Sequence, residues 1–133
     1  MILILGGTTE GRLAVKVADE AGSPYYYSTR GIQQEIACRN GIHLTGGMDV
    51  EAMTSFCIHH QIRLLVDAAH PFAVGLHQTV HETAIRLNLP VVRVERSYPE
   101  RATDIVWCED YEDAVCKLEK DRIHSLLSLT GVQ

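Results

Sequence analysis

The chain has 133 residues, of which 46% are hydrophobic and 22% charged, as in a globular domain with a buried core and unlike a disordered chain. The formal net charge of -5 argues against a general nucleic-acid binder, whose surface is usually basic. No apolar run approaches the roughly 20 residues that a membrane span needs.

The first part of the chain alternates apolar runs with amphipathic segments. The continuous apolar run 1–5 predicts a strand covered on both faces. Residues 9–21 carry apolar side chains at helical spacing, and residues 24–28 predict a second strand. Residues 33–39 predict a short helix, and residues 42–45 a third strand.

The same alternation continues through the middle of the chain. Residues 49–61 predict a helix that Asp49 caps, and the apolar run within 63–67 predicts a buried strand. Residues 72–87 form the longest helical pattern, and residues 91–95 predict the next strand. Towards the carboxyl end we expect a strand over residues 105–108, a helix over 111–120 and a strand over 125–129.

Strands that alternate with helices of about ten or more residues predict βαβ units and a parallel sheet. We therefore expect an α/β fold, a Rossmann-like doubly wound parallel sheet of about five to six strands with helices on both faces. We expect this nucleotide-binding domain over residues 1–124, and we interpret residues 125–133 as the start of a truncated second domain.

A glycine-rich run at residues 6–12, GGTTEGR, follows the first strand and opens the first helix. Glycine lets the backbone approach a pyrophosphate, and the N–H groups of a helix start point at the anion. Thr8 and Thr9 add hydroxyl donors, and one of them is expected to cap the helix. The spacing is G-G-x-x-x-G and not the usual G-x-G-x-x-G, so a tight turn that needs glycine only for packing stays an open alternative.

The second strand is followed by Ser28, Thr29 and Arg30, with no carboxylate. An Asp or Glu at this place usually holds the ribose 2′-hydroxyl of NAD, whereas hydroxyls and a guanidinium suit a 2′-phosphate. The sequence therefore favours NADP over NAD. The alternative is that Arg30 is a solvated loop charge.

The run 66–73, VDAAHPFA, closes the fourth predicted strand and opens the long helix, at the same sheet edge as the glycine turn. His70 can donate a hydrogen bond to a substrate carboxylate or act as an acid, and a capping or packing role is the alternative. His77 and His81 have helical metal-ligand spacing, but no third ligand is evident, and the four cysteines form no CxxC pair. We expect no metal, reduced thiols and a cytoplasmic location without a signal peptide.

Three segments together, at residues 2–12, 66–73 and 91–96, resemble the precorrin-6A reductase family of cobalamin biosynthesis. The resemblance implies NADPH-dependent reduction of precorrin-6A, or of cobalt-precorrin-6A, with the tetrapyrrole bound between two Rossmann-like domains. It implies catalytic or site-lining roles for Asp67 and His70. It implies that Arg93 and Arg96 meet substrate carboxylates, with pairing to Glu95 as the alternative. The residues that it implies for the cofactor phosphates are Gly6, Gly7, Thr8, Thr9 and Gly11.

Family members of this kind run to about 250 residues, the length of two domains. The chain is therefore expected to be the N-terminal half, poorly active by itself, with a second Rossmann-like domain in the full protein. Two other functions stay open: an NADP(H)-binding sensor or regulatory domain without catalysis, and another Rossmann-type NAD(P)-dependent reductase. Reductases with an extended Rossmann fold usually carry a Tyr-x-x-x-Lys pair. None of the five tyrosines is followed by Lys at that spacing, which argues against this type of reductase.

Overall fold

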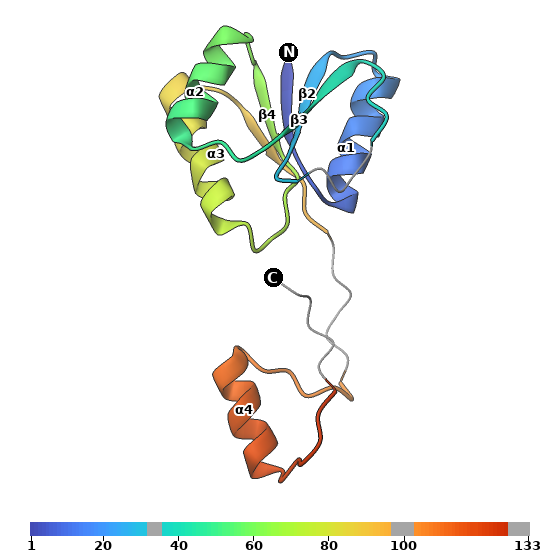
Figure 1. Cartoon of the computed structure of the whole chain (residues 1–133), viewed down its shortest axis with the longest axis vertical. Helices are drawn as coiled ribbons and strands as arrows, with labels where there is room; N and C mark the ends of the chain where they lie inside the picture. Colours follow the sequence, from blue (N-terminus) through green and yellow to red (C-terminus); the bar gives the residue numbers. More distant parts are fainter. Residues whose placement is uncertain (32–35, 97–102, 128–133) are drawn as a thin grey trace. The chain divides into compact units, whose positions relative to one another are not determined.

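A computed structural model of the protein describes residues 1–31, 36–96 and 103–127. The chain divides into two compact units, Met1–Ser97 and Tyr98–Gln133 (Figure 1). The first unit holds five strands, β1 (Ile2–Leu5), β2 (Tyr25–Thr29), β3 (Gly41–Thr45), β4 (Leu64–Asp67) and β5 (Val91–Arg93). Its helices are α1 (Thr9–Glu20), α2 (Val50–His59) and α3 (Val74–Leu87), and the second unit holds α4 (Tyr111–Lys120).

The five strands form one parallel sheet in the order β3-β2-β1-β4-β5. The chain moves outwards from β1 to β3, then returns to the other side of β1 for β4 and β5. This reversal is the switch point of a doubly wound sheet, beside which ligands usually bind. The sheet confirms the predicted fold class, and it places the carboxyl ends of all five strands at one edge.

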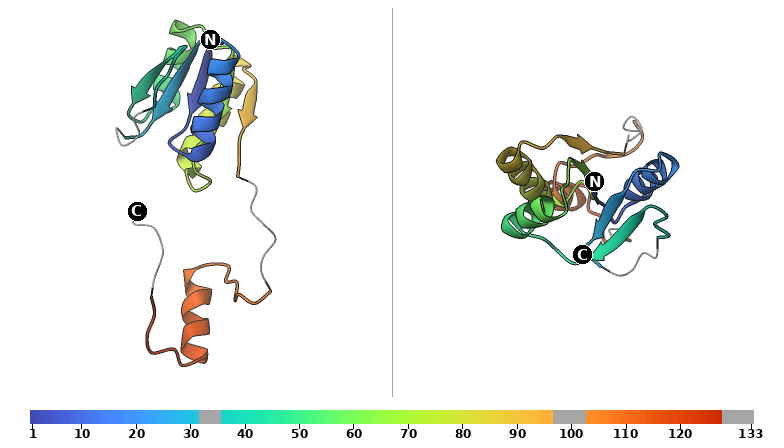
Figure 2. Two further views of the ribbon diagram at one scale, coloured as in Figure 1. Left: turned by 90° about the vertical axis from the view of Figure 1, so that its right-hand side faces the viewer. Right: turned by 90° about the horizontal axis from the view of Figure 1, so that it is seen from above.

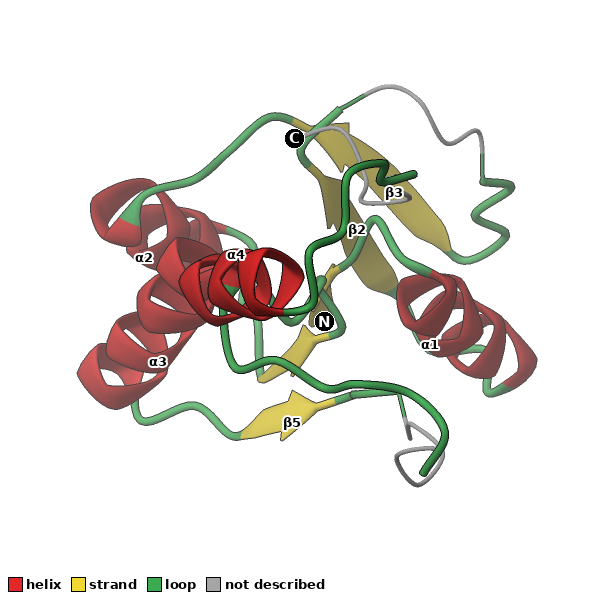
Figure 3. Ribbon diagram, turned by 90° about the horizontal axis from the view of Figure 1, so that it is seen from below, coloured by secondary structure: helices red, strands yellow, loops and turns green. Residues whose placement is uncertain are grey.

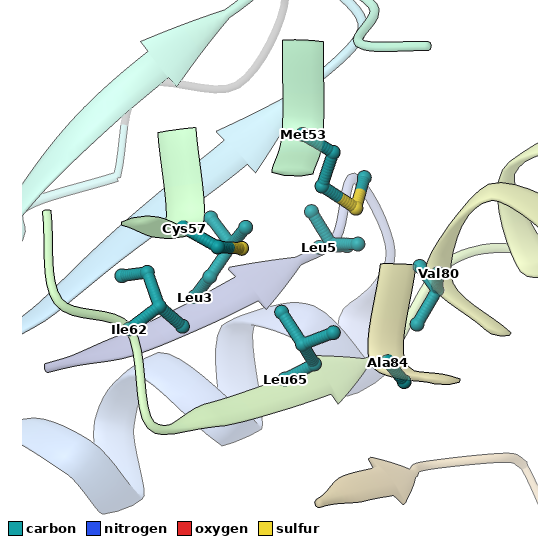
Figure 4. Packing of buried hydrophobic residues seen from close by; sticks show 8 residues of the cluster. All are labelled: Leu3, Leu5, Met53, Cys57, Ile62, Leu65, Val80 and Ala84. Atoms are coloured by element: carbon teal, nitrogen blue, oxygen red, sulfur yellow. The ribbon is translucent and has the colours of Figure 1, made fainter. Parts of the chain in front are cut away.

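Helices cover both faces of the sheet, with α1 on one face and α2 and α3 on the other (Figures 2 and 3). Because successive residues of a strand point to opposite faces, Leu3 and Leu5 face α2 and α3, whereas Ile4 faces α1. The larger core cluster fills the space between β1, β4 and the two helices (Figure 4). Its buried members are Leu3, Leu5, Met53, Cys57, Ile62, Leu65, Val80 and Ala84.

Polar side chains start two of these helices. The Oγ1 atom of Thr8 accepts a hydrogen bond from the N–H of Gly11, and the carboxylate of Asp49 accepts one from the N–H of Ala52. The predicted caps of α1 and α2 are therefore confirmed. Helix α3 ends at Asn88, whose φ of 51° is left-handed, as expected for a residue that stops a helix.

Three of the expected elements are absent where the structure describes them, at residues 105–108, 36–39 and 125–127. Residues 105–108 form no strand, and Ile105, Val106 and Trp107 are exposed. An apolar run forms a β-strand only when a neighbouring strand pairs with it. None of the described residues of the second unit forms such a strand. Residues 36–39 are not helical, and the other residues of the helix expected at 33–39 lie outside the described ranges.

The second unit contains α4, which Asp110 caps by accepting a hydrogen bond from the N–H of Asp113. None of the residues of α4 is buried. Residues 125–127 are not in a strand, and the rest of the strand expected at 125–129 lies outside the described ranges. The first compact unit ends at Ser97, whereas the expected boundary at residue 124 stays a prediction. Across the described ranges, no helix combines the length and apolar character that a membrane crossing requires.

Candidate functional site

A pocket of about 900 Å³ opens at the carboxyl edge of the sheet in the first unit. Its walls are the loops that follow β1, β2, β3 and β4, together with the first turns of α3. Seven of the predicted site residues line it: Gly6, Gly7, Thr8, Ser28, Thr29, Arg30 and His70. Of the described residues, Thr9, Gly11, Asp67, Arg93 and Arg96 were also predicted but do not line this pocket.

The glycine turn rests on the buried ring of Tyr27. A Cβ atom built on Gly6 would lie 2.6 Å from the Tyr27 hydroxyl oxygen, and one on Gly11 would lie 3.0 Å from it. Packing against Tyr27 therefore requires glycine at both positions. Burial raises the pKa of the Tyr27 phenol, against the opposing effect of a hydrogen bond from the N–H of Gly7.

Gly7 differs from its two neighbours in the motif. Its φ is +100°, a backbone conformation that residues with a side chain rarely adopt. A Cβ atom at this position would meet no atom within 4 Å. Its N–H donates to the Tyr27 hydroxyl across 2.9 Å. The outer side of the turn is therefore open space, at the head of a helix whose N-terminus favours anions.

Thr8 ties the glycine turn to the loop after β4. Its hydroxyl donates to the carbonyl oxygen of Ala68 across 2.6 Å and accepts from the N–H of Gly11 across 3.0 Å. Ala68 belongs to the second predicted site loop. The two loops are therefore joined by a direct hydrogen bond from a residue that lines the pocket.

The end of β2 brings Ser28, Thr29 and Arg30 to the pocket, as predicted. Ser28 and Thr29 are buried, whereas Arg30 is exposed. The Thr29 hydroxyl donates to the carbonyl oxygen of Gly31 across 2.9 Å and lies 2.8 Å from Nε2 of His43. A hydroxyl has one proton to donate. A phosphate could therefore accept a hydrogen bond from Thr29 only if the bond to the Gly31 carbonyl oxygen were broken.

Asp67 ends β4 and is buried, with 5% of its side chain exposed. One carboxylate oxygen lies 2.7 Å from Nη1 of Arg93, and the other lies 2.8 Å from Nδ1 of His77. Nε of Arg93 also lies 2.9 Å from the carboxylate of Glu95. Burial lowers the pKa of Arg93, but the two carboxylates outweigh it and raise that pKa. The charges of Asp67 and Arg93 thus neutralise each other inside the unit. Glu95 also pairs with Arg93, which is the alternative to substrate binding that the sequence left open for this arginine.

His70 lies in the pocket wall with an exposed side chain. Its Nδ1 atom accepts a hydrogen bond from the N–H of Phe72 across 3.2 Å. In the neutral ring, the proton then resides on Nε2, because only one nitrogen can carry it. This arrangement leaves a ring N–H as a donor beside the pocket.

Arg96, the other predicted substrate ligand, pairs with Glu10. Its Nε atom lies 2.8 Å from the Glu10 carboxylate, and this hydrogen bond holds the pKa of Glu10 below its ordinary value of 4.5. Glu10 lies in the first turn of α1, where the helix dipole also favours a negative charge. The ion pair joins α1 to the segment that follows β5.

Sequence reasoning missed several residues at or near the pocket. Arg12, Gly46, Met48 and Phe72 line it. The positions of Arg12 in the glycine-rich run and of Phe72 in the run 66–73 signal such a role. His77 was given no chemistry, yet it touches both Asp67 and the His70 loop. No group of three or more His, Cys, Asp or Glu side chains in the described ranges is placed to hold a metal ion.

These features define a Rossmann-type α/β domain with a pocket above a glycine turn. A family profile described as "Precorrin-6x reductase CbiJ/CobK" matches residues 1–133. The chain belongs to this family of reductases of cobalamin biosynthesis, which confirms the resemblance drawn from its three sequence segments.

Individual relatives agree with the family. The chain is 34% identical to a precorrin-6A reductase of Rhodococcus erythropolis, over 71% of this chain and 39% of the relative. It is 28% identical to a cobalt-precorrin-6A reductase of Methanocaldococcus jannaschii, over 99% of this chain and 54% of the relative. The chain thus spans about half the length of such relatives.

A solved structure described as "CobK precorrin-6A reductase" has the same fold, with a TM-score of 0.68 and 21% identity. The likeness covers 77% of this chain and 41% of that one.

Proposed function

We propose that the pocket binds NADPH and that the chain is the N-terminal, nucleotide-binding half of a reductase acting on precorrin-6A or cobalt-precorrin-6A. The observation that carries the proposal is the glycine turn at the head of α1, which opens on a pocket of about 900 Å³. A volume of this order suits a cofactor-sized ligand. Family membership and the names of the relatives support the choice of reaction.

The residues around the turn fit a diphosphate. The open side of Gly7 leaves room for phosphate oxygens, and the first turn of α1 presents its positive end there. Arg12 also lines the pocket, so a guanidinium is available beside the turn. Gly6 and Gly11 support this site from below, through their packing on Tyr27.

The end of β2 fits a ribose 2′-phosphate. Arg30 is exposed and lines the pocket, and it can form two parallel charge-assisted hydrogen bonds to a phosphate. Ser28 also lines the pocket, and none of residues 28–31 is a carboxylate that would repel the phosphate. The proposed nucleotide is therefore NADPH and not NADH.

NADPH, when bound, supplies a hydride. This chain contributes binding and orientation: the glycine turn holds the diphosphate, and the loop after β4 forms the wall beside which the substrate lies. The Nε2–H group of His70 is proposed to donate to a carboxylate of the tetrapyrrole or to act as an acid. Asp67 and Arg93, which hold each other inside the unit, are proposed to support this wall.

A second Rossmann-like domain is proposed to complete the site. The relatives are about twice as long as this chain, which supports the proposal. The second unit is also rich in exposed apolar side chains, as expected of a surface that another domain covers. They are Ile105, Val106, Trp107, Tyr111, Val115, Ile123, Leu126 and Leu127.

Calorimetric titration with NADPH and NADH tests the nucleotide proposal. We expect the wild-type chain to bind NADPH more tightly, and Arg30→Ala to weaken NADPH binding by at least about tenfold, since a charged hydrogen-bond pair is lost. NADH binding by Arg30→Ala should change little.

Arg63→Ala is the matched control. It removes the same charge from an exposed residue just before β4, at the opposite edge of the sheet. It should bind both nucleotides as wild type does. Equal affinity of the wild-type chain for NADPH and NADH would remove the role of Arg30, and no binding of either would overturn the proposed site.

A further inference from the structure

We propose that His77 is a positioning residue of the pocket: it ties the His70 loop to the buried carboxylate of Asp67. The proposal rests on the proposed function, because it concerns the wall of that same pocket. His77 lies in the first turns of α3 and does not itself line the pocket. It lies ten residues from Asp67 and seven from His70, and it contacts both.

The contact with the His70 loop fixes the proton on one ring nitrogen. Nε2 of His77 lies 3.1 Å from the carbonyl oxygen of His70. A carbonyl oxygen only accepts hydrogen bonds, so Nε2 carries a proton and donates it. The same carbonyl oxygen accepts the N–H of Ala73 across 2.8 Å, so two donors hold the turn that forms the pocket wall.

The other ring nitrogen lies between an anion and a cation. Nδ1 of His77 is 2.8 Å from the Asp67 carboxylate and 2.8 Å from Nη1 of Arg93. With a bare Nδ1, the ring accepts from Arg93, and with a protonated Nδ1, it donates to Asp67. The bond from Nε2 to His70 is present in both states, so the loop stays tied whichever partner Nδ1 takes.

The anchor at the far end of this chain of contacts is a buried carboxylate. Asp67 is buried at the end of a central strand and also accepts from the N–H of Ala69 across 3.3 Å. Helix α3 has no side-chain cap of its own at Ala73. Thr8 ties the start of this loop at Ala68, and His77 connects the buried end of β4 to its middle at His70. His77 therefore sets where the His70 ring N–H is presented.

Nuclear magnetic resonance of the unliganded wild-type chain gives the first test. Long-range ¹H–¹⁵N correlations of the histidine rings report which nitrogens carry protons. We expect Nε2 of His77 to be protonated throughout the pH range in which the chain is folded. A bare Nε2 would overturn the proposal without any variant, since the carbonyl oxygen of His70 cannot donate.

Two variants give the second test. The Gln side chain in His77→Gln can place an N–H near the former Nε2 and keep the tie to His70, whereas the Asn side chain in His77→Asn is too short. Exchange of the Phe72 amide hydrogen, which is bonded to the His70 ring, should accelerate by about tenfold in His77→Asn and stay near the wild-type rate in His77→Gln. His81→Asn, an exposed position on the same helix, is the control and should change nothing.

Equal exchange in His77→Asn and wild type, or equal disturbance by His77→Asn and His77→Gln, would overturn the proposal. NADPH titration of the same samples separates it from the proposed function. If wild type binds no NADPH, the proposed function fails, while the exchange rates still decide the role of His77. If wild type binds, His77→Asn should lower the affinity several-fold and His77→Gln should retain it.

Discussion

Gly6 shows how one residue of the motif is required by the packing of the interior as well as lining the pocket. The ring of Tyr27 occupies the space that a side chain at Gly6 would need, and the Tyr27 hydroxyl accepts the N–H of Gly7. The Tyr27 ring thus packs against the glycine turn and accepts one of its N–H groups. Gly7 alone of the three glycines in the motif combines a positive φ with open space on its outer side.

We predict that Gly6→Ala lowers the free energy of unfolding by about 1–3 kcal/mol, because the new methyl group overpacks the space against Tyr27. Denaturation in urea, followed by circular dichroism, measures the change. Gly75→Ala is the control, because a Cβ atom there meets nothing within 4 Å and lies within a helix. It should leave stability unchanged or raise it by up to about 1 kcal/mol. Equal effects of the two substitutions would contradict the packing role of Gly6.

At the scale of the elements, the Glu10–Arg96 ion pair joins the first helix to the segment after the last strand of the sheet. The folded-state pKa of Glu10 is lowered, mainly by the hydrogen bond from Arg96, so the carboxylate stabilises the fold when ionised. This stabilisation is fully present above the ordinary pKa of 4.5 and is lost as the pH falls through the lower folded value.

We therefore predict that Glu10→Gln is less stable than wild type at neutral pH, and that the difference shrinks as the pH falls below 4.5. Urea denaturation at a series of pH values measures it. Arg96→Gln removes the partner, so adding Glu10→Gln to it should cost less than adding Glu10→Gln to wild type. A difference that stays constant down to the lowest pH at which the chain is folded would refute the pairing.

The elements themselves were largely predictable, because apolar periodicity and capping residues are local signals. The parallel sheet, the Thr8 and Asp49 caps and the stop at Asn88 all follow from short stretches of sequence. The strand expected at residues 105–108 was wrong, because an apolar run alone does not reveal whether a partner strand exists.

The internal contacts of the site were not predictable in the same way. The Thr8–Ala68 hydrogen bond spans sixty positions in the sequence, and the contact between His77 and Asp67 depends on how α3 is rotated against β4. Three consecutive tyrosines likewise give no sign of which ring supports the turn. Alternation along β2 places Tyr25 and Tyr27 in the core beneath α1 and Tyr26 against the core on the opposite face.

At the scale of the whole molecule, every residue that lines the pocket lies between Leu5 and Thr79, within the first unit. A macrocycle held against this unit alone is contacted from one side, and loss of orientation costs catalysis heavily. We predict that the purified chain reduces precorrin-6A at least about a hundredfold more slowly than a full-length relative. Consumption of NADPH in the presence of precorrin-6A measures the rate.

NADPH titration of the same preparation is the control for that assay, because it shows that slow turnover does not come from a misfolded pocket. Turnover at the rate of a full-length relative would contradict the need for a second domain. Tight NADPH binding combined with no response to any tetrapyrrole would favour the sensor function over the reductase.

The position of Trp107 has a practical consequence for such measurements. It is the single tryptophan of the chain, and it belongs to the second unit, whereas Tyr25, Tyr26 and Tyr27 belong to the first. Indole emission therefore follows the second unit alone. Phenol absorbance comes from both units, because Tyr98 and Tyr111 belong to the second one. Replacing Tyr98 and Tyr111 by Phe confines the phenol signal to the first unit, and the two signals can then tell whether the two units unfold together or one after the other.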